Sequence, residues 1–373
     1  MKKIIFVCIF ILIYSILTFF INKNNYLTSY IKDKFSPETR FLIKKYIFPY
    51  KFIEDNQIKL NAHNNQIKKI INAYYNKNEK KKIKLEQLQK KRNLLLSKYI
   101  LDKNNTSISL LKNKDGYIIT KVNYYNIDHY SYFLNNRSEN LLIYIQGHSG
   151  DTFKKKYFKE IKKKSKDKNF DILILNMSGI GFNKQLSGNL FPGGNKVDLS
   201  NHESFSKFND LSNDKKALSL MLSGNYYLIL NALNKKNYLK VNVVGISGGA
   251  WYSIFMSALI TEISNTVSIS GTMPWPFMTF FKNTSDWEYF GKDLLYNLSY
   301  EELYYLNTLD EFFKPNRKLN LVYHKNDPCC YSSESATLFK EIFEKKKIPG
   351  IAISILDNDF HGIDTNNLLK IIF

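Results

Sequence analysis

The stretch VNVVGISGGAW, residues Val241–Trp251, decides the fold of this chain. An apolar, β-branched run breaks into Gly-x-Ser-x-Gly around Ser247, and the helix-compatible segment Ala250–Ile260 follows. A sharp turn from strand to helix strains the serine backbone and exposes its hydroxyl, while Gly245 and Gly249 let the two elements approach without a Cβ clash. The pattern therefore predicts that Ser247 is a nucleophile, with a glycine-rich turn that carries no chemistry as the alternative.

The composition allows one large domain with accessory segments, because 373 residues can bury a substantial core. Cysteine occurs only at Cys8, Cys329 and Cys330, which is not a disulfide framework and leaves the redox compartment open. His324 with Cys329 and Cys330 is too compact for a metal site and lacks a fourth ligand. We therefore predict no metal, no cofactor and a structural use of these cysteines.

The net charge of +21 is concentrated towards the N-terminus. Residues 23–103 hold 20 Lys and Arg against 7 Asp and Glu, and residues 104–373 carry only about +6. One interpretation is a solvated face. The other is attraction to anionic lipid headgroups, which is worth about 1 kcal/mol per basic residue near a membrane surface. No stacking-aromatic or glycine-loop module accompanies the lysines, so we predict no nucleic-acid partner.

An uncharged stretch, Ile4–Ile21, follows Lys2 and Lys3 and is just long enough to span a bilayer core as a helix. No pair of small residues typical of signal-peptide cleavage follows it, so a single-pass membrane anchor over residues 1–22 is favoured over a signal peptide. Basic residues flank both sides and leave the orientation open. Residues 23–105 carry apolar residues at helix-like intervals, which predicts a basic helical stalk or a collar packed on the next domain.

Strands and helices alternate from about residue 106 onwards. The predicted strands are 107–111, 117–125, 141–145, 172–176, 241–246, 267–270, 319–323 and 351–356, and the predicted helices are 153–166, 214–233, 248–263, 333–346 and 362–372. Continuous apolar strands between helices indicate an α/β domain over residues 106–373, with a mostly parallel sheet covered by helices on both faces. Chemistry is expected in the loops at the carboxyl ends of such strands.

Residues 106–373 resemble the α/β-hydrolase superfamily, in its serine esterase-like or lipase-like form. Three motifs carry the resemblance in the family's order: the Gly-x-Ser-x-Gly turn at Ser247, Asp327 after strand 319–323, and His361 after the last predicted strand. The resemblance implies a triad of these three residues, as nucleophile, acid and general base. A turn-initiating Asp-Pro pair and a surface-loop histidine are the alternatives for the last two.

Each of these roles has a physical requirement. A serine hydroxyl attacks only when a base takes its proton, and a histidine side chain such as that of His361 has the chemistry to do this. Asp327 would hold the ring in the required tautomer and stabilise the imidazolium. Asp357 and Asp359 are weaker candidates for the acid because they are too near His361 in the chain. The segment 268–272, where some members of the family place the acid, holds no carboxylate.

An oxyanion hole needs backbone N–H groups aimed at the position where negative charge develops. The amide of Gly248, directly after the nucleophile, is one candidate, and the amide of His148 is the other. The family usually places His-Gly after the corresponding strand, whereas this chain has Gln146-Gly147. This difference in side chain does not remove a backbone N–H donor from the loop. The His148 side chain could line the entrance or serve only the loop.

An aromatic insertion over residues 273–315 separates two predicted strands. We expect a lid over a substrate pocket, with Trp275 and Phe277 as substrate-binding residues, because such pockets are concave and largely apolar. Ordinary core helices packed on the sheet would explain the same aromatic residues.

Together these features predict a membrane-anchored serine hydrolase that cleaves a small-molecule, lipid or glycan carboxylic ester through an acyl-enzyme. A thioesterase or peptidase would use the same triad. A non-catalytic hydrolase-like binding protein and a basic scaffold at the membrane surface are alternatives from other classes. The oligomeric state stays open.

Overall fold

The computed structural model describes residues 68–69, 71–72, 85–111, 115–124, 127–148, 150, 152–184, 189–190, 196–197, 202–206, 213–280, 298–331, 333–346 and 348–373. All of them belong to one unit, residues 67–373. The predicted anchor and most of the predicted stalk lie outside the described residues. Every helix in the described part of the chain is too short or too polar to cross a bilayer.

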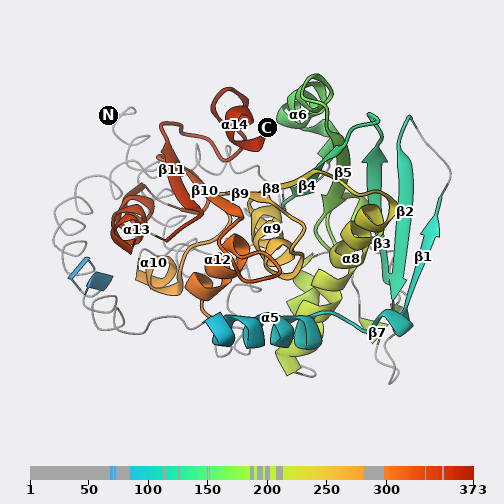
Figure 1. Cartoon of the computed structure of the whole chain (residues 1–373), viewed down its shortest axis with the longest axis horizontal. Helices are drawn as coiled ribbons and strands as arrows, with labels where there is room; N and C mark the ends of the chain where they lie inside the picture. Colours follow the sequence, from blue (N-terminus) through green and yellow to red (C-terminus); the bar gives the residue numbers. More distant parts are fainter. Residues whose placement is uncertain are drawn as a thin grey trace, which may run out of the picture. The chain divides into compact units, whose positions relative to one another are not determined.

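A nine-stranded sheet runs through this unit in the order β1-β2-β3-β5-β4-β8-β9-β10-β11 (Figure 1). The first three strands pair antiparallel, β3 joins β5 antiparallel, and all further pairings are parallel. The mostly parallel sheet predicted from the sequence is thereby confirmed. The strands are β1 Thr106–Leu110, β2 Ile118–Tyr124, β3 Ile127–Leu134, β4 Asn140–Gln146, β5 Asp171–Asn176, β8 Lys240–Ile246, β9 Asn265–Ile269, β10 Lys318–His324 and β11 Ile351–Leu356, with β6 Asn189–Leu190 and β7 Lys196–Val197 in a separate ribbon.

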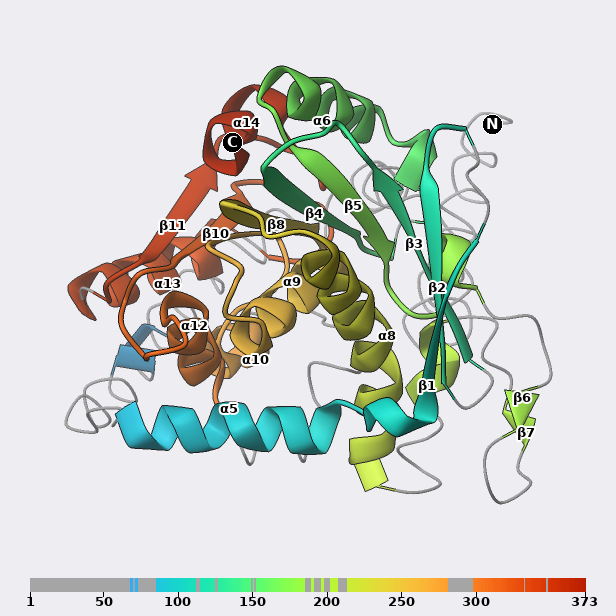
Figure 2. The same cartoon turned by 45° about the vertical axis from the view of Figure 1, so that its right-hand side comes forward.

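Helices cover both faces of the sheet, as Figure 2 shows with α6 and α14 together on one side and α8 and α9 on the other. The α-helices are α5 Leu85–Tyr99, α6 Lys156–Asp167, α8 Asn213–Lys235, α9 Gly248–Leu259, α10 Trp275–Phe280, α12 Tyr300–Thr308, α13 Ser333–Lys346 and α14 Thr365–Ile372. The 3-10 turns are η1 Lys103–Asn105, η2 Thr152–Lys154, η3 Gly181–Asn183 and η4 His202–Ser206.

The central strands are apolar at nearly every position because each face of the sheet has its own core. In β4, Leu141, Ile143 and Ile145 belong to the larger core under α8, α9, α12 and α13. Leu142 and Tyr144 point the other way, into the smaller core with α6 and α14. Burial on both faces explains why these strands lack the alternating pattern of a half-exposed strand.

Strand β3 was missed by the sequence prediction. Its buried positions include His129 and Ser131 beside Ile127, so its sequence, IDHYSYFL, contains no continuous apolar run. The strand forms because β2 pairs with residues 127–133 and β5 pairs with residues 131–134. Tertiary pairing therefore outweighs local composition here.

Helix α5 lies in the same compact unit as the sheet, residues 67–373. Its buried face includes Leu88, Leu95 and Tyr99, and Arg92 lies beside them with 5% of its surface exposed. The Arg92 guanidinium donates to the carbonyl of Ala258 at the end of α9, at 3.0 Å. Burial lowers the pKa of Arg92 to about 10.

His129 is fully buried on the sheet face under α8. Its Nε2 lies 2.7 Å from the Tyr124 hydroxyl, and the two rings stack with centroids 5.3 Å apart. A Cβ on Gly224 would meet the His129 ring at 2.3 Å, so glycine in α8 lets the helix lie directly on the histidine. Burial lowers the pKa of His129 to about 3, well below its ordinary value.

We predict that this histidine makes the fold acid-sensitive. The unfolded chain takes up a proton near pH 6.5 and the folded chain does not, so stability is lost as pH falls from about 6.5 towards 3, by about 2 kcal/mol at pH 5. Chemical unfolding at pH 7 and pH 5 measures this loss. The variant His129→Gln should show a smaller loss between the two pH values, and an equal loss in both proteins would contradict the assignment.

Candidate active site

Four neighbouring parallel strands bring polar residues to one edge of the sheet. Ser247 follows β8, Ser270 follows β9, Asp327 lies in the loop after β10, and His361 in the loop after β11. The strands are in register, with Ile246 paired to Ile269 and Ile269 to Val322. Adjacent strands are about 4.8 Å apart, so these loops meet above the carboxyl ends of the sheet.

Ser247 occupies the strained turn that the sequence predicts. Its φ of 55° and ψ of −129° are a backbone conformation that non-glycine residues rarely adopt, and it is the N-cap of α9. A Cβ on Gly245 would lie 2.1 Å from the carbonyl oxygen of Gly249, and a Cβ on Gly249 would lie 2.2 Å from that of Ile145. Only glycine fits at these two positions, because backbone atoms occupy the space.

The structure brings His361 and Asp327 together. Nδ1 of His361 lies 2.9 Å from Oδ2 and 3.0 Å from Oδ1 of Asp327, and both side chains are buried, with 6% and 0% exposed. An ionised carboxylate can only accept hydrogen bonds, so Nδ1 carries a proton in this pair. In the neutral ring, this is the tautomer in which Nε2 can take a proton from a nucleophile.

Asp327 receives further donors from its own loop and from the loop after β9. Its Oδ1 accepts from the backbone N–H groups of Cys329 at 2.8 Å and Cys330 at 3.3 Å, and its Oδ2 accepts from the Ser270 hydroxyl at 2.7 Å. Burial alone would raise the pKa of Asp327, but the hydrogen bond and charge of His361, with these further donors, hold it below its ordinary value. The carboxylate therefore stays ionised beside the imidazole.

Ser270 was not recognised from the sequence as a site residue. The segment 268–272 was set aside because it holds no carboxylate, yet its serine hydroxyl binds the carboxylate of the next loop. The only signal in the sequence is a polar residue at a predicted strand end; its φ of 48° is visible only in the structure.

Nε2 of His361 is buried and has no hydrogen-bond partner among the described residues, so the Ser247 hydroxyl is not bonded to it in this structure. Catalytic hydrogen bonds are often long in a free enzyme and close when substrate binds. The two residues approach the same edge of the sheet from β8 and β11.

The loop after β4 lies against the strained turn at Ser247, residues Gly245–Gly249, which we call the elbow. A Cβ on Gly147 would be 2.3 Å from the carbonyl oxygen of Ile246, and a Cβ on Gly248 would be 2.5 Å from Cε1 of His148. The His148 ring packs edge-on against His202, with centroids 4.6 Å apart. The two residues predicted to form the oxyanion hole are thus in direct contact beside Ser247.

Several aromatic residues in the described part of the insertion belong to the core, whereas Phe312 is exposed. Phe277 is fully buried, with its ring 5.2 Å from that of Phe339 in α13, so it packs inside the protein instead of contacting substrate as predicted. Tyr300 in α12 accepts a hydrogen bond from Nε1 of Trp251 at 3.1 Å. Trp275 begins α10, and its side chain lies outside the described residues, as do residues 281–297.

His324 is separate from the two cysteines with which the sequence grouped it. Its Nε2 is bonded to the backbone carbonyl of Gly362 at 2.8 Å, and burial lowers its pKa. Cys329 and Cys330 form a disulfide with each other. In the described part of the chain, the group of side chains with potential metal ligands in reach of one another is Cys329, Cys330 and His361.

No protein-family model matches this sequence, and no curated protein matches it. Among solved structures, the chain is similar to acetyl xylan esterase 1 from Thermoanaerobacterium sp., with 14% identity over 77% of this chain and 92% of that chain and a TM-score of 0.49. It is also similar to a glucuronoyl esterase from Caldicellulosiruptor kristjansonii (12% identity, 76% and 83% covered, TM-score 0.43) and an acetyl xylan esterase from Paenibacillus sp. R4 (11% identity, 77% and 90% covered, TM-score 0.42). At these identities and TM-scores, the similarity assigns neither substrate nor activity to this chain.

The chain's own architecture defines its class. A mostly parallel sheet with helices on both faces, a strained Gly-x-Ser-x-Gly turn between β8 and α9, and a His–Asp pair on the following strand ends constitute the α/β-hydrolase fold. The resemblance identified from the sequence is therefore confirmed at the level of the fold.

We predict that Gly249→Ala lowers the free energy of unfolding by about 3 kcal/mol or more, because the new methyl group meets backbone atoms that cannot move aside. Gly116→Ala is the matched control: its Cβ would meet nothing within 4 Å, and only its φ of 79° opposes the change. That control should lose about 1 kcal/mol. Denaturant unfolding of the two variants measures both losses of stability. Equal losses of unfolding free energy would mean that the close contact at Gly249 does not require glycine.

Proposed function

We propose that this protein is a serine hydrolase that cleaves a carboxylic ester through an acyl-enzyme, with Ser247 as nucleophile, His361 as general base and Asp327 as the acid. The observation that carries the proposal is the buried His361–Asp327 pair, at 2.9 Å, on the strand ends next to the strained Ser247 turn. An unpartnered Nε2 at the same carboxyl end of the sheet as such a turn has a direct use as a proton acceptor.

The proposed reaction uses these groups in sequence. Nε2 of His361 takes the proton of the Ser247 hydroxyl as its oxygen attacks the ester carbonyl, and Asp327 stabilises the resulting imidazolium. The backbone N–H groups of His148 and Gly248 would donate to the oxyanion; the His148 ring lies close to Gly248 at the start of α9. His361 then returns the proton to the leaving alcohol, and water hydrolyses the acyl-enzyme by the same route.

The second candidate is a hydrolase-like domain that binds a partner without catalysis. The missing hydrogen bond between Ser247 and Nε2 favours it, because a catalytic serine must reach its base. The contact of Nδ1 with the ionised Asp327 favours catalysis, since a binding surface has no need of a buried imidazole–carboxylate pair.

We predict that a fluorophosphonate probe labels the wild-type protein, because the probe reacts covalently only with a serine that a base activates. Ser247→Ala should abolish labelling, and Asp327→Asn should slow it by about 10⁴-fold, since the imidazole would lose its required tautomer. Labelling is measured as probe fluorescence on the intact protein.

Ser253→Ala is the control, because this buried serine lies in the same helix and donates to the carbonyl of Ala250 instead of facing the site. It should label like the wild type. Labelling that survives Ser247→Ala would refute the proposal. Hydrolysis of matched ester, thioester and amide substrates then assigns the bond, with the ester expected to turn over fastest.

We also propose that residues 1–22 anchor the protein in a membrane. The apolar stretch Ile4–Ile21 supports this proposal, and the basic residues of 23–103 would add attraction to anionic lipid. The hydrolase would then act on the side of the membrane where its domain lies.

We predict that the full-length protein stays in the membrane fraction through a high-salt wash and leaves it only in detergent, because a buried apolar helix is insensitive to ionic strength. Sedimentation after each wash measures this. Release by salt alone would replace the anchor with an electrostatic attachment through the basic segment.

A further inference from the structure

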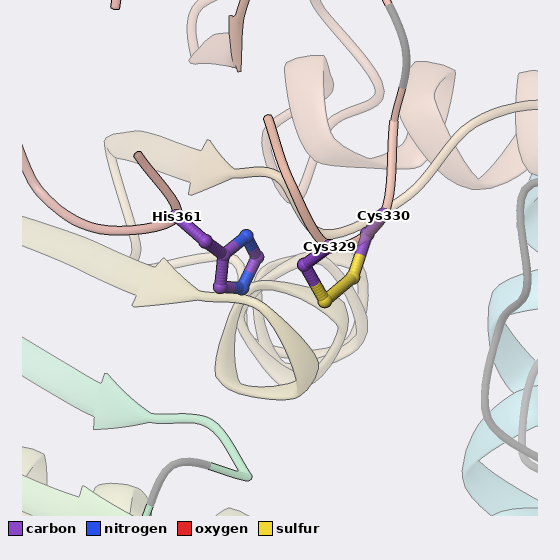
Figure 3. A group of neighbouring side chains, drawn as sticks. All are labelled: Cys329, Cys330 and His361. Atoms are coloured by element: carbon purple, nitrogen blue, oxygen red, sulfur yellow. A yellow bond between two sulfur atoms is a disulfide. The ribbon is translucent and has the colours of Figure 1, made fainter. Parts of the chain in front are cut away.

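The loop after β10 holds two cysteines next to the proposed general base. Cys329 and Cys330 are joined by a disulfide, and Figure 3 shows His361 with its ring nitrogens on the side towards the sulfur atoms. One ligand atom from each of the three residues lies within 4.8 Å of the others. Two sulfurs and an imidazole are the donor set that soft divalent cations prefer.

The contact that would orient His361 for proton transfer would also orient it for metal binding. Histidines that bind metals usually donate their second ring N–H to a carboxylate, which fixes the ring and leaves the other nitrogen for the ion. Nδ1 of His361 makes this contact with Asp327 at 2.9 Å. Nε2 is buried and without a hydrogen-bond partner in the described part of the chain, so it is the nitrogen open to a ligand.

The same carboxylate also positions the cysteines. Asp327 accepts from the backbone N–H groups of Cys329 and Cys330, so one side chain holds all three potential ligands in one frame. Cys329 is exposed, which lets a reductant or an ion reach the pair from solvent. In a tetrahedral site with metal–sulfur bonds of about 2.3 Å, ligand atoms are about 3.7 Å apart, so the two sulfurs must separate after reduction and the imidazole must approach them by about 1 Å at most.

We propose that Cys329 and Cys330, when reduced, bind a soft divalent cation such as Zn²⁺ or Cd²⁺ together with Nε2 of His361. Two external thiols supply the two electrons and two protons that open the disulfide, and they leave as the oxidised external disulfide. The cation then displaces both cysteine thiol protons, and water takes the fourth position. Disulfide and metal exclude each other, because both use the same two sulfur atoms.

Metal binding would inhibit the proposed hydrolase. This inhibitory role, unlike the metal site itself, rests on the proposed function. A cation on Nε2 occupies the lone pair that must accept the Ser247 proton, so neither attack nor protonation of the leaving group can occur. Oxidation to the disulfide would leave His361 available. The loop thus couples the redox state and the metal supply to the activity.

The test is a Cd²⁺ titration of the full-length protein, followed by the ultraviolet absorption band of cadmium–thiolate bonds. The protein reduced with a phosphine and then freed of reductant should bind one Cd²⁺ with this band. The oxidised wild type should show no band, and this comparison needs no substitution. Cys8→Ser should bind like the wild type, since Cys8 is the remaining cysteine of the chain.

The variants locate the ligands. The double substitution Cys329→Ser, Cys330→Ser should remove the band, and His361→Gln should keep the band but weaken Cd²⁺ affinity by about tenfold or more. A band of equal strength in the double variant or in the oxidised protein would overturn the site. Unchanged affinity in His361→Gln would overturn the histidine's part in it.

Activity is read separately with the fluorophosphonate probe. Loss of labelling on Cd²⁺ binding, restored by a chelator, supports the inhibitory role, and undiminished labelling of the Cd²⁺-bound protein overturns it. If the reduced, metal-free protein is not labelled at all, the proposed hydrolase function has failed, while the absorption titration still decides whether the metal site exists.

Discussion

The contact between the backbones of β8 and α9 is the constraint on which the site depends. Gly245 and Gly249 bring the strand and the helix so close that a single methyl group would collide with a carbonyl oxygen at 2.1–2.2 Å. This approach forces the residue between them, Ser247, into its positive φ and lifts it to the edge of the sheet. The backbone strain at such a position is worth about 1–3 kcal/mol, and the buried strands on either side supply the stability that sustains it.

A second constraint joins the loops that follow β9, β10 and β11. Asp327 accepts hydrogen bonds from the Ser270 hydroxyl, from the His361 ring and from the backbone of its own loop. Burying a carboxylate is expensive unless donors surround it, so these contacts are as much a condition of folding as of chemistry. Displacement of any one of these loops would leave a buried charge with fewer partners.

The sequence predicted best what is encoded locally. The elbow at Ser247 and the strand-end positions of Asp327 and His361 follow from short patterns on consecutive elements, and the parallel sheet follows from its apolar strands. Strand β3 was missed because His129 and Ser131 are buried by tertiary pairing that no local pattern encodes. Neither the hydrogen bond from Ser270 nor the core position of Phe277 was predictable, since each depends on a loop or helix distant in sequence.

Not every basic residue of 23–103 can contact lipid, because Arg92 is buried and bonded within the fold. Its guanidinium donates to the carbonyls of Leu306 and Leu309, and the buried Arg317 donates to the same two oxygens. Burial and the charge of Arg92 lower the pKa of Arg317 to about 9. Two cations tolerate this proximity because the last carbonyls of α12 carry the negative end of the helix dipole. Any electrostatic attraction to a membrane must therefore come from the other lysines and arginines of this segment, while α5 holds its end of the segment firmly on the hydrolase fold.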